Sequence, residues 1–460
     1  MSDDTSTSNA AHAPRAAGSD RQYLNAADRL MLVAHQGLLG VGHSGFTCQT
    51  HVWFEGRVDV RRLRDALARL NHRYPVITSR LVAPGGYRVP YWKHRDGAEV
   101  VLTESTLDGA TDRDVWGFGE SLNDRPFSHA ESDPIVWRLL HLPDGNDVLI
   151  LLFSHALMDG KSPEHMLKLL DALWDHDGVA VTQPPSADEI VGHLRREKVG
   201  KRARSAVRRL RHEWRYSKPA AMIIPRVDRV WRATPFRILV REMNEMETDR
   251  AIARVKRLCG FANLAPALLA GVFRSIRTLG PDVDNRGRQC KTDVPLNLRP
   301  PGRSEPIFRN FMTFIKLGAT PEEMTDSEAL VRTLNGRMRD ELRNGIDLGS
   351  LQMMSFMAPH ANLMRRHLLR TLRKGPVSLG FGFLGSVIPG LTKLGATPIR
   401  RLYTMNAALS PPGITLQGHQ YQGRLSLVLT HIGATVNDEL AAAFLQHIMD
   451  ELTGVHDAKT

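Results

Sequence analysis

The sequence predicts a mixed α/β protein built from two lobes. With 460 residues, of which 42% are hydrophobic and 24% charged, the chain is long enough to bury two large cores. In the first half, strand-like runs at residues 47–53 and 148–153 alternate with helical patterns. The second half repeats this mixture, with helical patterns at 248–258 and 265–279 and a strand-like run at 290–296. Composition alone leaves other α/β folds open.

We expect four segments along the chain. The first residues are rich in Ser, Ala, Asp and Thr and almost free of large apolar side chains, so residues 1–21 are predicted to be a disordered tail. Residues 22–190 are expected to form an N-terminal lobe, residues 191–219 a basic amphipathic crossover helix, and residues 220–460 a C-terminal lobe.

The most informative stretch is residues 149–160, where an apolar run typical of a buried strand ends in a polar cluster. That cluster consists of Ser154, His155, Asp159 and Gly160. A helix is predicted to follow at once, with Ser162 as N-cap and Pro163 at the first helical position. Histidine accepts a proton near neutrality, so a strand that delivers one imidazole to a loop suits general-base catalysis. The alternative is a buried histidine whose nitrogens bond to backbone groups.

This stretch resembles the HHxxxDG signature of the CoA-dependent acyltransferase superfamily. That superfamily includes chloramphenicol acetyltransferase, the condensation domains of peptide synthetases, polyketide-associated and plant acyltransferases, and bacterial wax ester synthases. In this resemblance His155 matches the catalytic second His, Asp159 the structural Asp and Gly160 the Gly. Ser154 stands where the family usually has its first His, so the motif here is SHxxxDG.

Further segments are similar to blocks of this family and follow in the same order. They are the helical pattern at 56–75, the "RPF" of residues 125–127 with residues 134–140, the "PLNLRP" of 295–300, Arg309-Asn310, and the hairpin pattern at 413–430. The resemblance thus covers nearly all of the chain after about residue 22. It implies two chloramphenicol-acetyltransferase-like lobes that form a V-shaped pseudo-dimer, with the catalytic histidine at the centre of a tunnel.

The resemblance also implies a mechanism. His155 would be the general base that deprotonates a hydroxyl or amine, and this acceptor would attack an acyl thioester on CoA or on a phosphopantetheinyl carrier protein. Arg299 would pair with Asp159 to hold the loop, and Ser154 and Asn310 are candidates for oxyanion or substrate contacts. We expect no bound cofactor and no metal, with acyl-CoA or the acyl carrier as co-substrate and a small molecule or lipid as acceptor.

The serine at position 154 leaves two alternatives open. One is a member of the superfamily that carries out another reaction in the same tunnel, such as cyclisation or thioester release. The other is a non-catalytic protein that binds a carrier. A serine hydrolase is not expected, because adjacent strand residues point to opposite faces and no GxSxG elbow is present.

The segment from residue 195 to 218 carries most of the chain's positive charge. Eleven basic residues are opposed by two glutamates, so it contributes +9 to a formal net charge of +12; the basic residues are Arg195, Arg196, Lys198, Lys201, Arg202, Arg204, Arg208, Arg209, Arg211, Arg215 and Lys218. Apolar residues recur at helical spacing on one face, at Val199, Ala203, Val207, Leu210 and Trp214. Such a helix either packs this stripe on a lobe or docks on an anionic membrane surface or an acidic carrier protein.

A second cationic helical pattern at residues 362–374 also favours an acidic partner. It is followed by a Gly-rich apolar run at 377–391, which is expected to form a strand lining an apolar channel or a lid. Nucleic acid binding would fit the charge, but the sequence contains no recognisable nucleic-acid-binding motif.

The cysteines and the hydropathy indicate the cellular compartment in which the protein is expected. Cys48, Cys259 and Cys290 show no metal-ligand spacing and no disulfide framework, which fits a reducing cytosol. No uninterrupted apolar run reaches the roughly 18 residues that a spanning helix needs. We therefore expect a cytoplasmic monomer of natural-product or lipid biosynthesis, with peripheral membrane association left open.

Overall fold

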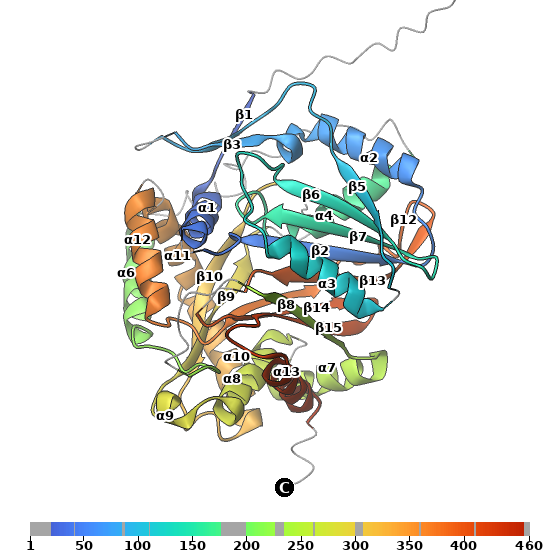
Figure 1. Ribbon diagram of the computed structural model, residues 1–460. Helices are drawn as coiled ribbons and strands as arrows, with labels where there is room; N and C mark the ends of the chain where they lie inside the picture. The colour runs from blue at the N-terminus through green and yellow to red at the C-terminus, as the bar shows by residue number, and fades with distance from the viewer. Residues whose placement is uncertain are drawn as a thin grey trace, which may run out of the picture.

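The computed structural model describes residues 20–40, 42–84, 88–109, 111–175, 199–225, 234–260, 263–299, 307–357, 360–408 and 411–454. Most of the tail expected at 1–21 therefore lies outside the described residues, although Arg21 begins the short strand β1. The same holds for residues 176–198, which include the first four residues of the basic segment. Within the described residues the chain forms two lobes, drawn one above the other in Figure 1.

The upper lobe in Figure 1 is built on a six-stranded sheet in the order β12-β13-β2-β7-β6-β5. Its strands are β12 (Lys393–Leu394), β13 (Thr397–Asn406), β2 (Thr47–Phe54), β7 (Asp147–Ser154), β6 (Ile135–His141) and β5 (Leu102–Thr106). Helices α2 (Val60–Arg73) and α4 (Ser162–Ala172) belong to the same hydrophobic core as Leu149, Leu151 and Phe153, which alternate along β7.

Strands β12 and β13 come from the segment assigned by sequence to the C-terminal lobe, yet they extend the sheet of the other lobe. β13 pairs antiparallel with β2 over residues 399–406 of one and 48–54 of the other. This exchange ties the two lobes together through a backbone ladder whose register shifts once, between Ile399 and Arg401.

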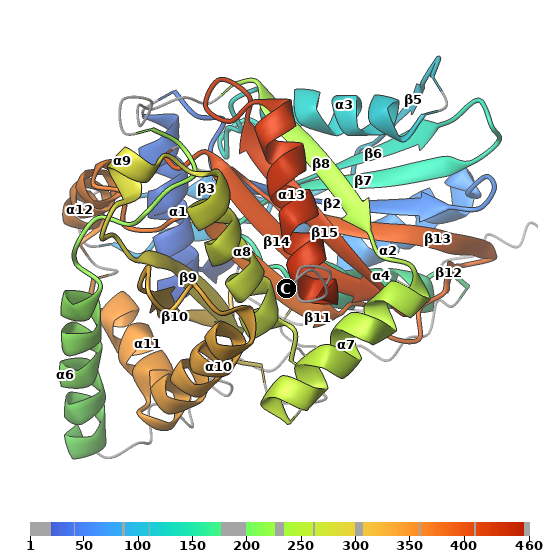
Figure 2. The same ribbon diagram turned by 90° about the horizontal axis from the view of Figure 1, so that it is seen from below.

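The lower lobe is built on a four-stranded sheet in the order β11-β14-β15-β8. Its strands are β11 (Gly380–Ser386), β14 (Ile414–Tyr421), β15 (Arg424–Ile432) and β8 (Phe236–Glu242). Three helices cover its outer face in Figure 2, namely α7 (Glu245–Cys259), α8 (Ala265–Leu279) and α13 (Asp438–Thr453). Side chains such as Phe273 and Phe444 are fully buried between these helices and the sheet.

Helix α3 (Asp112–Asn123) fills the space between the two sheets. Its Trp116 belongs to a core cluster with Val148 and Ile150 of β7 and with Phe236 and Ile238 of β8. Both faces of β7 are thus buried, which explains why its sequence is a continuous apolar run and does not alternate.

The remaining described elements are two small sheets and the other helices. β9 (Cys290–Asn297) and β10 (Met312–Ala319) form a two-stranded sheet, and β1 (Arg21–Tyr23), β4 (Tyr91–Lys93) and β3 (Arg80–Val82) form a three-stranded one. The other helices are α1 (Ala26–Leu39), the 3-10 helix η1 (Pro75–Thr78), α6 (Val199–Arg215), α9 (Asp282–Asn285), α10 (Ser327–Arg343), α11 (Ile346–Met357) and α12 (Ala361–Arg373).

The sequence located these elements closely, misplaced one helix cap and left two alternatives open that the structure decides. Helix α4 begins at Ser162 itself, after Lys161, so Ser162 is not the N-cap. Of the two alternatives for the Gly-rich run at 377–391, the structure has the strand: residues 380–386 form β11, which lies at the edge of its sheet and parallel to β14. The described part of the basic segment is helical as expected, but Val207, Leu210 and Trp214 of α6 face solvent instead of a lobe.

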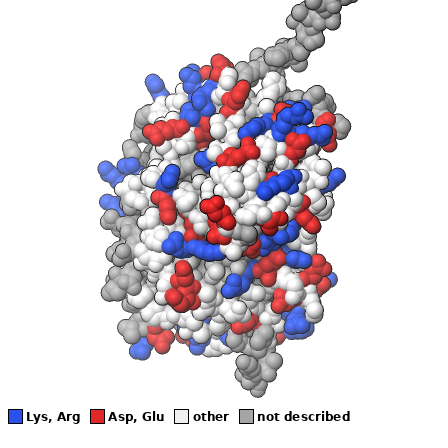
Figure 3. Space-filling view, turned by 45° about the vertical axis from the view of Figure 1, so that its right-hand side comes forward, with Lys and Arg blue, Asp and Glu red and all other residues white. Residues whose placement is uncertain are grey.

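Two surface properties complete the description. No helix among the described residues is long and apolar enough to cross a membrane. On the face shown in Figure 3, acidic and basic side chains are interspersed, so the chain's net positive charge is not concentrated there.

Candidate active site

His155 lies directly after β7, at the junction of the lobes. Its backbone N–H donates to the carbonyl of Phe46 (3.1 Å), which precedes the neighbouring strand β2. The imidazole is buried and packs against the Phe46 ring, with 4.8 Å between the ring centroids. The strand pair therefore fixes both the backbone and one face of this ring.

Asn310 of the other lobe fixes the orientation of the imidazole. The Nδ1 of His155 lies 3.1 Å from Asn310 Oδ1, and Asn310 Nδ2 donates to the His155 carbonyl (2.8 Å). Because an amide oxygen only accepts, the ring proton belongs on Nδ1, where it is donated to Asn310. Nε2 then keeps its lone pair, which is the form that a general base requires.

Asp28 of α1 in turn holds Asn310. Its Oδ1 accepts from both the backbone N–H (2.8 Å) and the Nδ2 (2.9 Å) of Asn310, while its Oδ2 accepts from the N–H of Asn25 (2.9 Å). Burial raises the pKa of Asp28 above its usual range, although Arg309 opposes this shift. Sequence reasoning missed Asp28, whose only local signal is its place in the capping box that starts α1 at Asn25.

The protonation state of His155 suits a base at neutral pH. Burial lowers the pKa of the imidazole below 6.5, and the charge of Asp159 and the hydrogen bond to Asn310 oppose that shift only in part. A pKa below 6.5 means that the ring is mainly neutral at pH 7.

Asp159 turns to the opposite lobe and pairs with Arg299. Arg299 Nη1 lies 2.9 and 2.7 Å from the two carboxylate oxygens, and the backbone N–H of Phe311 donates to Asp159 Oδ2 (2.8 Å). Although burial opposes it, the guanidinium and this N–H hold the pKa of Asp159 below its usual range. Both side chains are almost fully buried, so this pair fastens the loop after His155 to the segment between β9 and β10.

Gly160 lies where the loop passes β11. A Cβ added at Gly160 would lie 3.2 Å from the Leu384 side chain, tighter than ordinary van der Waals contact. The glycine of the motif therefore allows the loop to approach the other lobe closely.

The structure gives Ser154 a role different from the expected oxyanion or substrate contact. Its hydroxyl is fully buried, lies 2.6 Å from His129 Nε2 and accepts from the N–H of Ala156 (3.1 Å). The ring of His129 packs 4.1 Å from that of His35. Burial lowers the pKa of both imidazoles, to about 4 for His35, so both rings are neutral at pH 7. Ser154 thus braces the start of the loop.

Asn310 is likewise not free to bind an oxyanion, since its amide group already donates to the His155 carbonyl and to Asp28. Of the residues singled out by sequence, the structure gathers His155, Asn310, Asp159, Gly160 and Arg299 at one junction. Ser154 joins a separate group with His129 and His35. Among the described residues, no three His, Cys, Asp or Glu side chains are placed to hold a metal ion.

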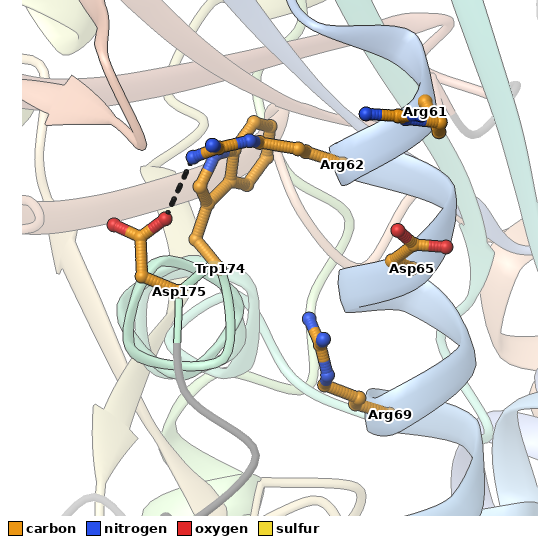
Figure 4. Close-up of a pocket in the computed structure, with 6 residues that line it drawn as sticks. All are labelled: Arg61, Arg62, Asp65, Arg69, Trp174 and Asp175. Atoms are coloured by element: carbon orange, nitrogen blue, oxygen red, sulfur yellow. Dashed lines mark hydrogen bonds and ion pairs between the residues drawn. The ribbon is translucent and has the colours of Figure 1, made fainter.

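A pocket of about 360 Å³ lies elsewhere, between α2 and the end of α4 (Figure 4). Arg62 bonds to Asp175 across it (2.9 Å). The pocket contains none of the residues around His155; its lining is Arg61, Arg62, Asp65, Arg69, Trp174 and Asp175.

No protein-family model and no curated protein matches the sequence. Solved structures do match over almost the whole chain. Trichothecene 15-O-acetyltransferase TRI3 from Fusarium sporotrichioides is 11% identical, with a TM-score of 0.71 over 95% of this chain and 97% of its own. The first condensation domain of the CDA synthetase is 16% identical, with a TM-score of 0.69 over the same shares.

The epimerization domain from the third module of tyrocidine synthetase B is also similar, at 10% identity and a TM-score of 0.64 over 95% of this chain and 97% of its own. An acetyltransferase, a condensation domain and an epimerization domain therefore share this architecture. The chain thus has the two-lobed fold that these acetyltransferase, condensation-domain and epimerization-domain structures share.

Proposed function

We propose that this protein is an acyltransferase that moves an acyl group from a thioester to a hydroxyl or amine, with His155 as the general base. The observation that carries the proposal is the contact of His155 Nδ1 with Asn310 Oδ1, because it leaves Nε2 as the proton acceptor. The fold supports the same assignment, since similar structures include an acetyltransferase and condensation domains.

The reaction needs no covalent acyl-enzyme. Nε2 takes the proton of the acceptor as its oxygen or nitrogen attacks the thioester carbonyl, which forms a tetrahedral intermediate and an imidazolium. The intermediate collapses, breaks the carbon–sulfur bond and expels the thiolate, which takes the proton back from Nε2. The burial of His155 at the junction of the lobes supports a mechanism in which catalysis comes largely from holding both substrates together.

We propose CoA or a phosphopantetheinyl carrier protein as the donor's carrier. Among the similar structures, the condensation and epimerization domains belong to peptide synthetases, which supports the carrier-protein form. The positive net charge of the chain fits either donor, because both are anionic.

The test is turnover of a panel of acyl-CoA thioesters with alcohol and amine acceptors, followed by thiol release and product mass. His155→Ala should stay folded and bind the donor, but lose turnover by about 10²- to 10⁴-fold or more. His72→Ala, at an exposed histidine of α2, is the matched control and should turn over normally. The wild-type rate should fall only below pH 6.5, as His155 takes up a proton.

Ser154→Ala separates direct transfer from a covalent route. Because Ser154 bonds to His129 and not to His155, its loss should lower the rate less than the loss of His155. An acyl-serine detected by mass spectrometry, together with an inactive Ser154→Ala variant, would refute direct transfer. Release of a free acid or of a cyclised or epimerised product instead of an ester or amide would favour another reaction at the same site.

A further inference from the structure

Helix α6 packs on the protein through its polar face. Ser205, Arg209 and His212 recur on one side of the helix and are buried, as is Tyr216 directly after its last residue. Their side turns toward α11, where Gly349 permits close approach, since a Cβ there would lie 2.5 Å from the Ser205 carbonyl.

The reason for this orientation lies in β10, whose free edge in the two-stranded sheet exposes backbone carbonyls. Arg209 Nη1 donates to the carbonyl of Phe314 (3.4 Å), and His212 Nε2 lies 3.0 Å from that of Lys316. Burial lowers the pKa of His212 to about 4, so its ring is neutral and donates through Nε2–H. The polar face of α6 therefore packs against the edge of β10 and satisfies its backbone carbonyls.

As a consequence, the apolar stripe of α6 points away from the protein. The exposed fractions are 48% for Val207, 61% for Leu210 and 80% for Trp214, among the largest for apolar residues in the described chain. Exposed arginines lie along the same helix beside this stripe, at Arg204, Arg208, Arg211 and Arg215. An apolar ridge with a tryptophan and a cationic flank is the pattern of helices that lie in a membrane interface.

The neighbouring elements extend this surface. Phe356, on the adjacent helix α11, is 77% exposed. Figures 1 and 2 both place α6 and α12 at the same outer edge of the molecule. Helix α12 and its C-cap residue add four more exposed cations: Arg365, Arg366, Arg370 and Lys374. Two separate basic helices on one edge suit an extended planar partner.

We propose that α6 docks the protein on an anionic lipid membrane, with Val207, Leu210 and Trp214 entering the interface and the arginines contacting lipid headgroups. Each cation near such a surface strengthens binding, and a tryptophan ring prefers the headgroup level. A bilayer accounts for both the charge and the outward apolar ridge. This proposal is independent of the acyl-transfer proposal, because binding is measured without substrate.

The experiment is flotation of the full chain with vesicles of phosphatidylcholine alone or with phosphatidylglycerol. The wild type should bind the anionic vesicles, and 0.5 M salt should weaken that binding because it screens charge. Arg204→Gln/Arg211→Gln should weaken it about thirtyfold. Arg241→Gln/Arg250→Gln, which removes the same charge from exposed positions on β8 and α7, should leave binding unchanged.

A second variant tests the ridge. Leu210→Ser/Trp214→Ser removes two exposed side chains, so the fold should survive, as judged by the melting temperature, while vesicle binding falls at least about tenfold. Turnover of a small thioester should be unchanged in both variants, since neither touches the site around His155.

Three outcomes would overturn the proposal. Wild-type protein that does not float with anionic vesicles refutes it outright, as does a control variant that loses binding as strongly as the α6 variants. An α6-dependent complex with a purified acidic acyl carrier protein, in the absence of vesicle binding, would assign the surface to that protein instead. Self-association that disappears in Leu210→Ser/Trp214→Ser, again without vesicle binding, would assign it to a second copy.

Discussion

At the scale of single residues, the site depends on contacts that cross between the lobes. Asn310 orients the His155 ring, and Arg299 neutralises Asp159. Both residues lie in the segment that connects β9 to β10. The loop that presents the imidazole is therefore ordered by the opposite lobe. A buried carboxylate that loses its cation is left uncompensated in a medium that solvates charge poorly.

The Asp159–Arg299 pair gives a prediction for unfolding in urea. Asp159→Ala and Arg299→Ala should each reduce the free energy of unfolding by about 3–5 kcal/mol, because each leaves the other charge buried and unpaired. The double variant should be no worse than about one single variant. Losses that add strictly would show that the two side chains do not depend on each other. Arg299→Lys, which keeps the charge but loses the planar fork, should lie in between.

At the scale of elements, α3 joins the two sheets through a buried carboxylate. Glu120 Oε1 accepts from the backbone N–H of Ile238 in β8 (2.9 Å) and from Arg113 Nη1 (2.6 Å), while Oε2 accepts from Arg113 Nη2 (2.8 Å). The N–H of Phe236, also in β8, donates to Asp124 at the end of the same helix (2.9 Å). Helix α3 thus supplies the acceptors that the edge strand of the lower sheet lacks.

We expect Glu120→Ala to lower the free energy of unfolding by about 1–3 kcal/mol, because it orphans a buried backbone donor. Glu120→Gln retains an acceptor and should lose less. Ser121→Ala, at the next and exposed position of the same helix, is the control and should change stability by no more than about 0.5 kcal/mol. A loss in Ser121→Ala as large as in Glu120→Ala would assign the effect to the helix rather than to the contact with β8.

At the scale of the whole molecule, buried neutral histidines make stability depend on pH. Burial lowers the pKa of several imidazoles, among them those of His35 (to about 4), His51 (to about 3), His419 (to about 4) and His129. In the unfolded chain each of them titrates near 6.5. Below that pH the unfolded chain binds protons that the native protein does not, so stability falls as the pH falls.

We therefore expect the free energy of unfolding to drop by several kcal/mol between pH 6.5 and 5, at up to about 1.4 kcal/mol per pH unit for each of these histidines. His141 works in the opposite direction, because hydrogen bonds to Asp147 and Glu104 outweigh its partial burial and raise its pKa. Urea unfolding in steps of half a pH unit measures the sum. A free energy of unfolding that stays constant down to pH 5 would contradict the prediction. A decrease that begins only below pH 4.5 would assign the acid sensitivity to carboxylates and not to these histidines.

Many of the helices and strands, and some of the residues of the candidate site, could be predicted from the sequence. The runs at 47–53 and 290–296 correspond to β2 and β9, and the pattern at 265–279 is α8, because local periodicity reports which faces are buried. His155, Asp159 and Arg299 were found through motifs of recognisable spacing. Asp28 and His129 were missed, because each stands alone in the sequence and acquires its partner more than twenty residues away.

The sequence by itself determined the elements, the catalytic candidate and the basic amphipathic character of α6. Only the tertiary structure decided which face of α6 is buried, that β13 joins the sheet of the other lobe, and that Ser154 bonds to His129. The physical reason is common to all three. Local periodicity shows which residues share one face of a helix or strand. Which face is buried depends on contacts with distant parts of the chain; in α6 the polar face is buried because Arg209 and His212 bond to carbonyls at the edge of β10.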